Sequence, residues 1–149
     1  MTIEDITKSN AIGIEKKTVL NILVTQTALS ERMNEILKSY DLSAEQFNVL
    51  RILRGQKGSP ANMHMIQERM IAKTSNTTRL VDKLLLKELV TREICTKNRR
   101  KMEVLITAKG LDLLQKLDPK ITQHESDFAS KLTLAEINKL NELLEKYRS

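Results

Sequence analysis

Hydrophobic residues return every three or four positions along most of the chain, which predicts a mainly helical protein. The expected helices cover residues 14–40, a short stretch from 44, 63–71 and about 75–88, with two further helices that begin after Thr107 and after Thr133. Residues 89–107 differ, because Met102, Val104 and Ile106 alternate with their neighbours as a half-buried strand requires. That stretch predicts two short strands joined by a polar tip. Residues 1 to about 10 show neither period and are expected to form a loose lead-in.

Polar residues stand where four of these helices should begin: Ser43, Asn62, Thr107 and Thr133. The first and the last are followed three positions later by Gln46 and Glu136, the pattern of a capping box. Residues 55–62, with Gly58 and Pro60, are expected to form a turn. Pro119 is expected to kink its helix or to restart it with Asp118 as a new cap.

Two short helices separated by a tight connection, at 63–71 and about 75–88, predict a helix-turn-helix. On the second helix Thr77, Leu80, Val81 and Leu84 share the core face, while Ser75 and Arg79 point away from it. Thr74 or Ser75 is expected to cap that helix. Free backbone N–H groups at a helix start suit a phosphate, and Asn and Arg can pair with base edges in the major groove.

The candidate DNA contacts therefore form two groups. The start of the second helix contributes Thr74, Ser75, Asn76, Thr78, Arg79 and Lys83. The tip between the two strands contributes Lys97, Arg99, Arg100 and Lys101. The alternative interpretations are an ordinary solvated helix face and an ordinary charged hairpin tip.

The distribution of charge favours DNA over these alternatives. Residues 69–103 contain ten Lys or Arg and four Asp or Glu, so this segment carries the whole net charge of +6. The rest of the chain is neutral. A net charge gathered in one stretch is an electrostatic footprint for phosphate.

Length and composition add limits. A chain of 149 residues is expected to form a single domain, and only four Gly and two Pro suit a helical one. No hydrophobic run approaches the roughly 20 residues of a membrane-spanning helix, so no membrane partner is expected. The first residues lack the layout of a secretory signal, and one Cys fits a reducing compartment, so we expect a cytoplasmic protein.

Four motifs, in this order and spacing, carry a resemblance to a known family. They are TTRLVDKL at 77–84, LVTR at 89–92, NRR at 98–100 and VLITAKG at 104–110. Over about residues 42–110 the chain resembles the multiple-antibiotic-resistance regulator (MarR) family of bacterial winged-helix transcription factors. The resemblance implies a winged helix-turn-helix over 42–107, with a recognition helix at about 75–88 and a wing at about 89–107.

The resemblance also implies a homodimer on a palindromic operator. Residues 11–40 and 108–149 would be the dimerisation helices, which fits their long hydrophobic faces with few local partners. Many members release DNA when a small aromatic or phenolic effector binds between the lobes. The family usually has acids at Cys95 and Asn98, so the tip is more positive here. Asp82 matches a family acid that holds a wing arginine, and we predict an Asp82–Arg99 pair.

Other chemistries have weaker support. Cys95 suggests a redox role, but an ordinary strand residue is the preferred interpretation, since nothing in the sequence marks it as a reactive thiol. His64 and His124 are isolated and lack the spacing of a metal site. Most Met residues are expected to fill the core, although Met33 could line a ligand pocket. No motif of an enzyme or of a cofactor site is present, so neither catalysis nor a cofactor is expected.

The sequence therefore predicts a homodimeric, sequence-specific DNA-binding regulator, most simply a repressor released by an effector. Two alternatives remain open at this point. One is a non-specific architectural DNA binder, which charge alone would favour. The other is a winged helix that binds proteins, although such modules usually lose the basic wing.

Overall fold

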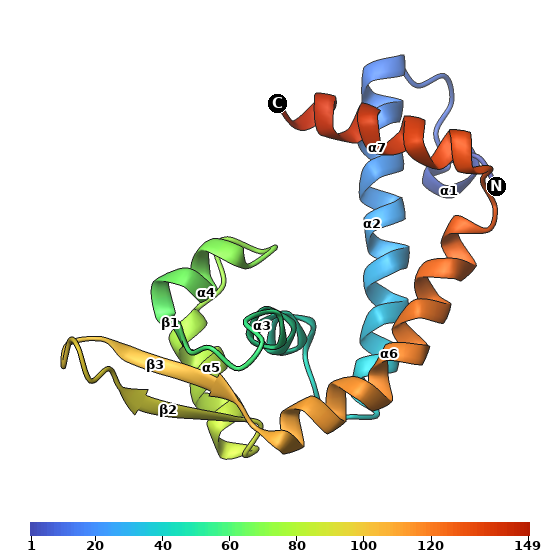
Figure 1. Ribbon diagram of the computed structural model, residues 1–149. Coiled ribbons are helices and arrows are strands. Elements are labelled where there is room, and N and C mark those ends of the chain that lie inside the picture. The colour runs from blue at the N-terminus through green and yellow to red at the C-terminus, as the bar shows by residue number, and fades with distance from the viewer.

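A lobe of short helices and strands is joined to a stem of long helices in the computed structural model, which describes all 149 residues (Figure 1). The elements, in chain order, are α1 (Ile3–Thr7), α2 (Ile14–Lys38), α3 (Ala44–Gly55), β1 (Ala61–Asn62), α4 (Met63–Arg69), α5 (Thr77–Leu86), β2 (Val90–Ile94), β3 (Met102–Ile106), α6 (Ala108–Ala129) and α7 (Leu134–Arg148). Helices with a small β wing are the predicted fold class, and the structure confirms it.

The lobe is built around α3, which packs against α2, α4, α5, α6 and β3. Its antiparallel sheet has the strand order β1-β3-β2, with Val90 opposite Ile106 and Ala61 opposite Val104. The side chains of Leu50 and Leu84 are fully buried in the core. Full burial of such a side chain contributes about 1.5–3 kcal/mol, so this core supplies most of the stability of the lobe.

All four predicted caps are confirmed. Their side-chain oxygens accept the backbone N–H three residues on, with Ser43 accepting from Gln46 at 3.1 Å and Thr133 from Glu136 at 3.3 Å. In both of these the N3 side chain also accepts the N–H of the capping residue, which completes the capping box. Asn62 and Thr107 each cap their helix in the same manner.

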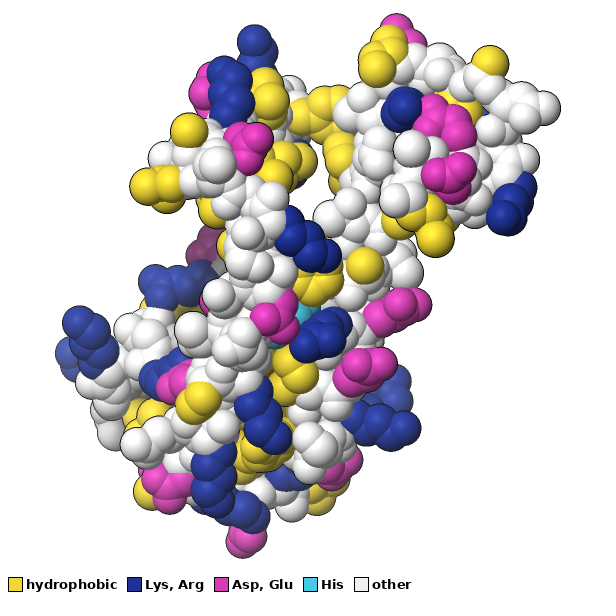
Figure 2. All heavy atoms as spheres, turned by 90° about the vertical axis from the view of Figure 1, so that its right-hand side faces the viewer, with side chains coloured by type: hydrophobic (Ala, Val, Ile, Leu, Met, Phe, Trp, Pro, Cys, Tyr) yellow, Lys and Arg dark blue, Asp and Glu magenta, His cyan; other side chains and the backbone are white.

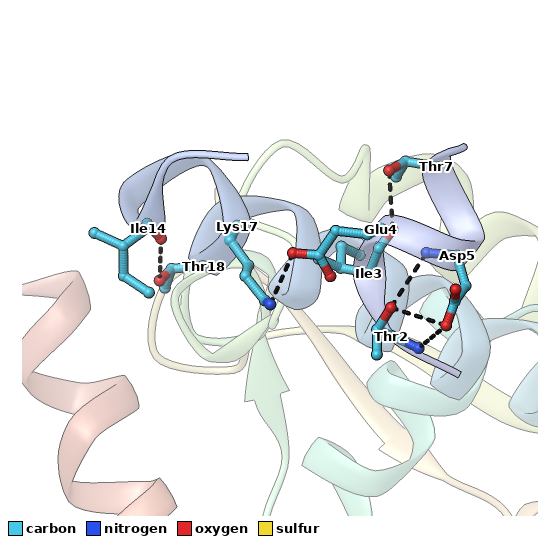
Figure 3. A network of polar contacts seen from close by, with 8 residues as sticks. All are labelled: Thr2, Ile3, Glu4, Asp5, Thr7, Ile14, Lys17 and Thr18. Carbon is cyan, nitrogen blue, oxygen red and sulfur yellow. Dashed lines mark hydrogen bonds and ion pairs between the residues drawn. The ribbon is translucent and has the colours of Figure 1, made fainter. Parts of the chain in front are cut away.

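The start of the chain differs from the predicted loose lead-in, because residues 3–7 form α1. Thr2 and Asp5 make a capping box, and Lys17 on α2 lies 2.8 Å from the carboxylate of Glu4 (Figure 3). Ile3 is 2 % exposed. A helix of five residues is unstable alone, so the buried Ile3 and the ion pair to α2 account for its position.

The predicted turn at 55–62 ends in a strand that the sequence pattern did not reveal. Ala61 and Asn62 form β1, which pairs with β3 at Val104 and Glu103. Two residues are too few to show an alternating pattern, so this strand could not be recognised from periodicity.

Asp118 does not cap a restarted helix, which corrects that alternative. α6 is continuous from Ala108 to Ala129 with Pro119 inside it, and it bends along its length (Figure 1). The bend agrees with the kink that a proline causes by removing one backbone hydrogen bond. Asp118 instead accepts two hydrogen bonds from Arg54 on α3, at 2.9 and 3.0 Å. This pair fastens the lobe to the stem.

The stem consists of α2 and α6 side by side, and α7 follows α6 and crosses in front of α2 in the view of Figure 1. α7 buries none of its residues, and Leu134 and Tyr147 are 73 % and 56 % exposed. Figure 2 shows hydrophobic side chains on the upper part of the molecule, away from the lobe. No helix of the chain has both the length and the hydrophobicity needed to cross a membrane.

The junction between the wing and α6 depends on Thr107 and Gly110. Thr107 donates its hydroxyl hydrogen to the Glu88 carbonyl at 2.8 Å and accepts the Gly110 N–H at 3.0 Å. A Cβ atom on Gly110 would lie 2.4 Å from the Leu89 carbonyl oxygen and 2.7 Å from Cγ1 of Ile106. No side chain fits there unless the backbone moves.

We therefore expect Gly110→Ala to lower the free energy of unfolding by roughly 1–3 kcal/mol, the usual cost of overpacking. Urea denaturation followed by circular dichroism measures the change. Gly55→Ala is the matched control, since no atom lies within 4 Å of the added Cβ. That control should be neutral or slightly stabilising, because alanine favours a helix. Equal effects of the two variants would contradict the close approach at Gly110.

Lowering the pH should unfold helix α1. The N–H and hydroxyl groups of Thr2 lower the pKa of Asp5 below its ordinary value of 3.8 by donating to its carboxylate. A carboxyl group with a lowered folded-state pKa stabilises the fold above its unfolded-state value, and that contribution is lost as the pH falls through the folded-state value. The helical Cα chemical shifts of residues 3–7 should therefore collapse below about pH 3.8. In Asp5→Asn this step should vanish; an unchanged step would show that Asp5 is not its cause.

Candidate nucleic-acid interface

The recognition helix is capped one position after Ser75 and two after Thr74, the two caps that were predicted, and it begins at Thr77. Asn76, and not Thr74 or Ser75, caps α5, and its side-chain oxygen accepts the Arg79 N–H at 3.1 Å. The helix ends at Leu86 because Glu88 adopts a φ of 59°, a left-handed conformation that a helix cannot continue through. The helix is thus shorter than the predicted 75–88. The side-chain amide oxygen of Asn76 already accepts the hydrogen bond that caps it.

Two side-chain amides that were not predicted from the sequence hold the turn before α5, and Asn48 is the buried one of the two. Asn48 on α3 is 8 % exposed and accepts the Ile71 N–H at 2.9 Å. Gln67 on α4 accepts the Thr77 hydroxyl and donates to the Lys73 carbonyl. A buried polar group that lost its partner would cost about 1–3 kcal/mol, so these contacts fix the turn. The only sequence signal was an amide on an otherwise hydrophobic helix face.

The start of α5 borders a hollow of about 470 Å³ between α3 and the turn. Five predicted contacts line it together: Thr74, Ser75, Asn76, Arg79 and Lys83. Thr78 is exposed but does not line this hollow. A surface that presents a helix start, short polar side chains and two cations suits the edge of a nucleic acid.

The wing tip is organised by Asn98. Its backbone carbonyl accepts the Lys101 N–H at 2.9 Å, and its side chain accepts the Arg100 N–H at 3.1 Å. The Cys95 N–H donates to the Lys101 carbonyl at 2.9 Å and closes the hairpin. Asparagine is typical of such turns because its side chain bonds to the backbone two residues on. The residue that departs from the family pattern therefore shapes the tip.

Asp82 pairs with Arg92 on β2 and not with the predicted Arg99. Arg92 Nη1 lies 2.9 Å from the Asp82 carboxylate. β2 runs beside α5, so Arg92 reaches the middle of that helix, whereas Arg99 belongs to the tip beyond the strands. Asp82 still connects the wing to α5, but it does so at the base of the wing.

The remaining cations have no acidic partner. None of Arg79, Lys83, Lys97, Arg99, Arg100 and Lys101 lies within 4 Å of a carboxylate, and all six are exposed. Charges that are not neutralised within the protein remain available to phosphates, which dominate the affinity of DNA-binding proteins.

A protein-family comparison identifies the segment that holds this surface. The MarR family model matches residues 42–102, from the end of the α2–α3 connection to the first residue of β3. The winged-helix lobe of this chain therefore matches the MarR family. Members of this family are transcription factors and not enzymes, so the chain is a DNA-binding transcriptional regulator with a winged helix.

Individual relatives agree with this assignment. The HTH-type transcriptional regulator MhqR of Bacillus subtilis is 27 % identical over 134 residues, which cover 89 % of this chain and 91 % of MhqR. The crystal structure of a MarR transcription factor from Planctomyces limnophilus is 29 % identical, with a TM-score of 0.70, and covers 91 % of this chain and 98 % of its own. A MarR-like regulator from Bacillus cereus, 23 % identical, has the same fold at a TM-score of 0.79 over 91 % of this chain and 97 % of its own.

Between the lobe and the stem lies a hollow of about 710 Å³, bordered by α2, α3 and α6. Met33 lines it, as the sequence analysis suggested, together with His124. His124 is 4 % exposed, and its Nδ1 atom has no hydrogen-bond partner. The hollow has the volume of a small-molecule site.

The other candidate residues have ordinary surroundings. Cys95 is half-buried beside the wing tip. His64 is exposed on α4 with Glu68 at 3.2 Å, far along the chain from the buried His124 on α6. The structure brings no three His, Cys, Asp or Glu side chains together as a metal site.

The Asp82–Arg92 pair should act on the wing more than on global stability. An exposed pair contributes about 0.2–1 kcal/mol, so Asp82→Ala and Arg92→Ala should each leave the urea midpoint nearly unchanged. Amide exchange in β2 and β3 should become faster in both variants, and no faster in the double variant. Arg99→Ala is the control, because its effect on exchange should add to that of Asp82→Ala. Coupling of Asp82 to Arg99 in place of Arg92 would restore the original prediction.

Proposed function

We propose that this regulator is a homodimeric repressor that binds a palindromic operator and is released from it by a small-molecule effector. One observation carries the DNA-binding part of the proposal. Six exposed cations without acidic partners lie on α5 and at the wing tip, the two elements with which winged helices contact DNA.

Each group has a separate role in this proposal. The start of α5 enters the major groove, where Arg79 pairs with base edges and Ser75, Asn76 and Thr78 contact bases or nearby phosphates. Lys97, Arg99, Arg100 and Lys101 bind the backbone or the adjacent minor groove. Contacts to phosphates fix position and affinity, whereas contacts to base edges fix sequence.

The dimer is supported by the uncovered hydrophobic faces of the stem. Leu134, Leu140, Leu143 and Tyr147 on α7 are between 45 % and 73 % exposed, and Ile14 on α2 is 71 % exposed. Soluble monomers rarely expose such contiguous patches. A second copy that covers these faces would place two lobes about one helical turn of DNA, roughly 10 base pairs, apart.

The effector is supported by the hollow between the lobe and the stem and by the names of relatives with this fold. Those relatives include PcaV in complex with its natural ligand, an organohalide-sensing regulator, and BpsR, whose DNA binding is regulated by 6-hydroxynicotinic acid. MepR of S. aureus has been solved as a complex with DNA. By analogy, we infer a small aromatic or phenolic effector that shifts this chain towards a lobe spacing that no longer fits the operator.

A titration of DNA from upstream of the chain's own gene tests the proposal. Fluorescence anisotropy near physiological salt, with scrambled duplex as competitor, should show tight binding by two chains per site. Sedimentation measures the dimer independently. Binding that either competitor or salt abolishes would favour the architectural alternative, and no binding at low salt would favour a protein-binding module.

Arg79→Ala and Arg100→Ala should differ in this assay. Arg79→Ala should weaken operator binding by about 1–3 kcal/mol and leave scrambled DNA nearly unaffected, since it removes a base contact. Arg100→Ala should weaken binding to operator and to scrambled DNA alike, since it removes a phosphate contact. The slope of the logarithm of the binding constant against the logarithm of the salt concentration should fall by about 1. Lys57→Ala, outside both groups, is the control. Equal losses on operator and scrambled DNA for the two arginines would contradict this division of roles.

A further inference from the structure

Two lysines on the same face of α5 have different surroundings. Lys83 and Lys87 are four residues apart, so they lie one above the other on the helix, and both line a hollow of about 620 Å³ beside the end of α2. Lys83 is exposed and has no carboxylate within 4 Å. Lys87, at the C-cap of α5, has only 27 % of its side chain exposed. The two lysines therefore differ in what they contact.

The ammonium group of Lys87 is occupied within the protein. It donates to the backbone carbonyl oxygen of Asp41 and to Oε1 of Gln46, the latter at 3.0 Å. The carboxylate of Asp41 lies 3.5 Å away. A lysine ammonium has three hydrogens to donate, and here each has an acceptor on the protein. No donor remains for a DNA phosphate, although Lys87 belongs to the basic segment of the chain.

The partners of Lys87 belong to the end of the stem and to the start of α3. Asp41 follows α2 and adopts a φ of 53°, a left-handed conformation that is uncommon for a residue with a side chain. Gln46 is 6 % exposed, and the same Oε1 atom accepts the Ser43 N–H at 3.3 Å in the capping box of α3. Lys87 therefore joins the end of the recognition helix to the connection between α2 and α3.

The start of α6 holds the same end of α5 through backbone atoms. Lys109 donates to the Lys87 carbonyl at 3.0 Å, and the Thr107 hydroxyl donates to the Glu88 carbonyl at 2.8 Å. These carbonyl groups are present whatever side chain stands at position 87. Only the contacts with Asp41 and Gln46 depend on the lysine itself, so a substitution of Lys87 removes them selectively.

We propose that Lys87 is a positioning residue for DNA recognition, which holds the end of α5 against Asp41 and Gln46 and thereby sets where the helix presents Arg79, without touching the DNA. Arg79 lies eight residues earlier, about 12 Å along the helix axis. Paired hydrogen bonds to a base edge require a geometry correct to about 0.5 Å, so a small shift of the helix is sufficient to lose them. This inference rests on the proposed function, because it assumes that α5 reads the operator.

Binding of the full-length protein to operator DNA at several salt concentrations separates positioning from phosphate binding. Lys87→Met keeps the length of the side chain but has no donor, and it should weaken operator binding about tenfold with an unchanged salt slope. Lys83→Met is the matched comparison and should lower the slope by about 1, as loss of a phosphate contact does. Lys87→Arg restores the charge and the donors and should bind within about threefold of the wild type.

A double variant tests whether Lys87 acts through Arg79. In an Arg79→Ala background, Lys87→Met should weaken operator binding by less than about threefold, because the contact that it positions is already absent. A tenfold loss in that background, or a lowered salt slope in Lys87→Met alone, would overturn the inference. Thermal unfolding establishes a temperature at which every variant is folded, and Lys87→Gln, which keeps one amide donor, provides a milder change with an intermediate loss.

Amide hydrogen exchange in the protein without DNA provides an independent test. Lys87→Met should speed exchange in α5 at least about fivefold, with α7 unchanged as an internal reference. Lys87→Arg should restore the wild-type rates, and Lys83→Met should leave them unaltered. Unchanged exchange in Lys87→Met would overturn the inference. If the wild type shows no preference for operator over scrambled DNA while exchange follows this pattern, the proposed function fails and the role of Lys87 in holding α5 remains.

Discussion

The packing of α3 at the centre of the lobe is the constraint on which the rest of the structure depends. This helix packs against α2, α4, α5, α6 and β3, and half of its twelve residues are buried. Two of those are amides that act on the recognition helix. Asn48 accepts the Ile71 N–H before the start of α5, and Gln46 accepts a hydrogen bond from Lys87 just after its end, at 3.0 Å. One helix thus forms the core and also holds both ends of α5 in place.

Interactions between residues close in sequence, such as helix caps, were sufficient to predict much of the fold. A cap requires only a side chain and a backbone N–H three residues away, so Ser43, Asn62, Thr107 and Thr133 were all identified before the structure. The same rule applies to Thr2 and Asp5, yet the short hydrophobic pattern there concealed α1. The stability of α1 depends on its contacts with α2, and these contacts cannot be read from the sequence.

Partners from different elements could not be predicted in the same manner. Asp82 has several arginines within reach along the chain, and only the position of β2 beside α5 selects Arg92. Asp118 satisfies the local rule for a cap but is engaged by Arg54, 64 residues earlier. The exposed cations of the candidate DNA surface were found from composition, because solvated charges need no specific neighbour. The amides of Asn48 and Gln67 that support them were not predicted, because their partners lie on the turn before α5 and on α5 itself.

The same helix connects the hollow between the lobe and the stem, where we propose that an effector binds, with the DNA-binding surface. Ser43 and Glu45, at the start of α3, border both the hollow that contains His124 and the hollow at the start of α5. At the other end of α3, the two hydrogen bonds between Arg54 and Asp118 fasten it to α6 beside Pro119. A ligand that displaces the first turn of α3 would therefore pivot the helix about a fixed end. Because Gln46 and Asn48 lie between these points, such a pivot moves α5 with it.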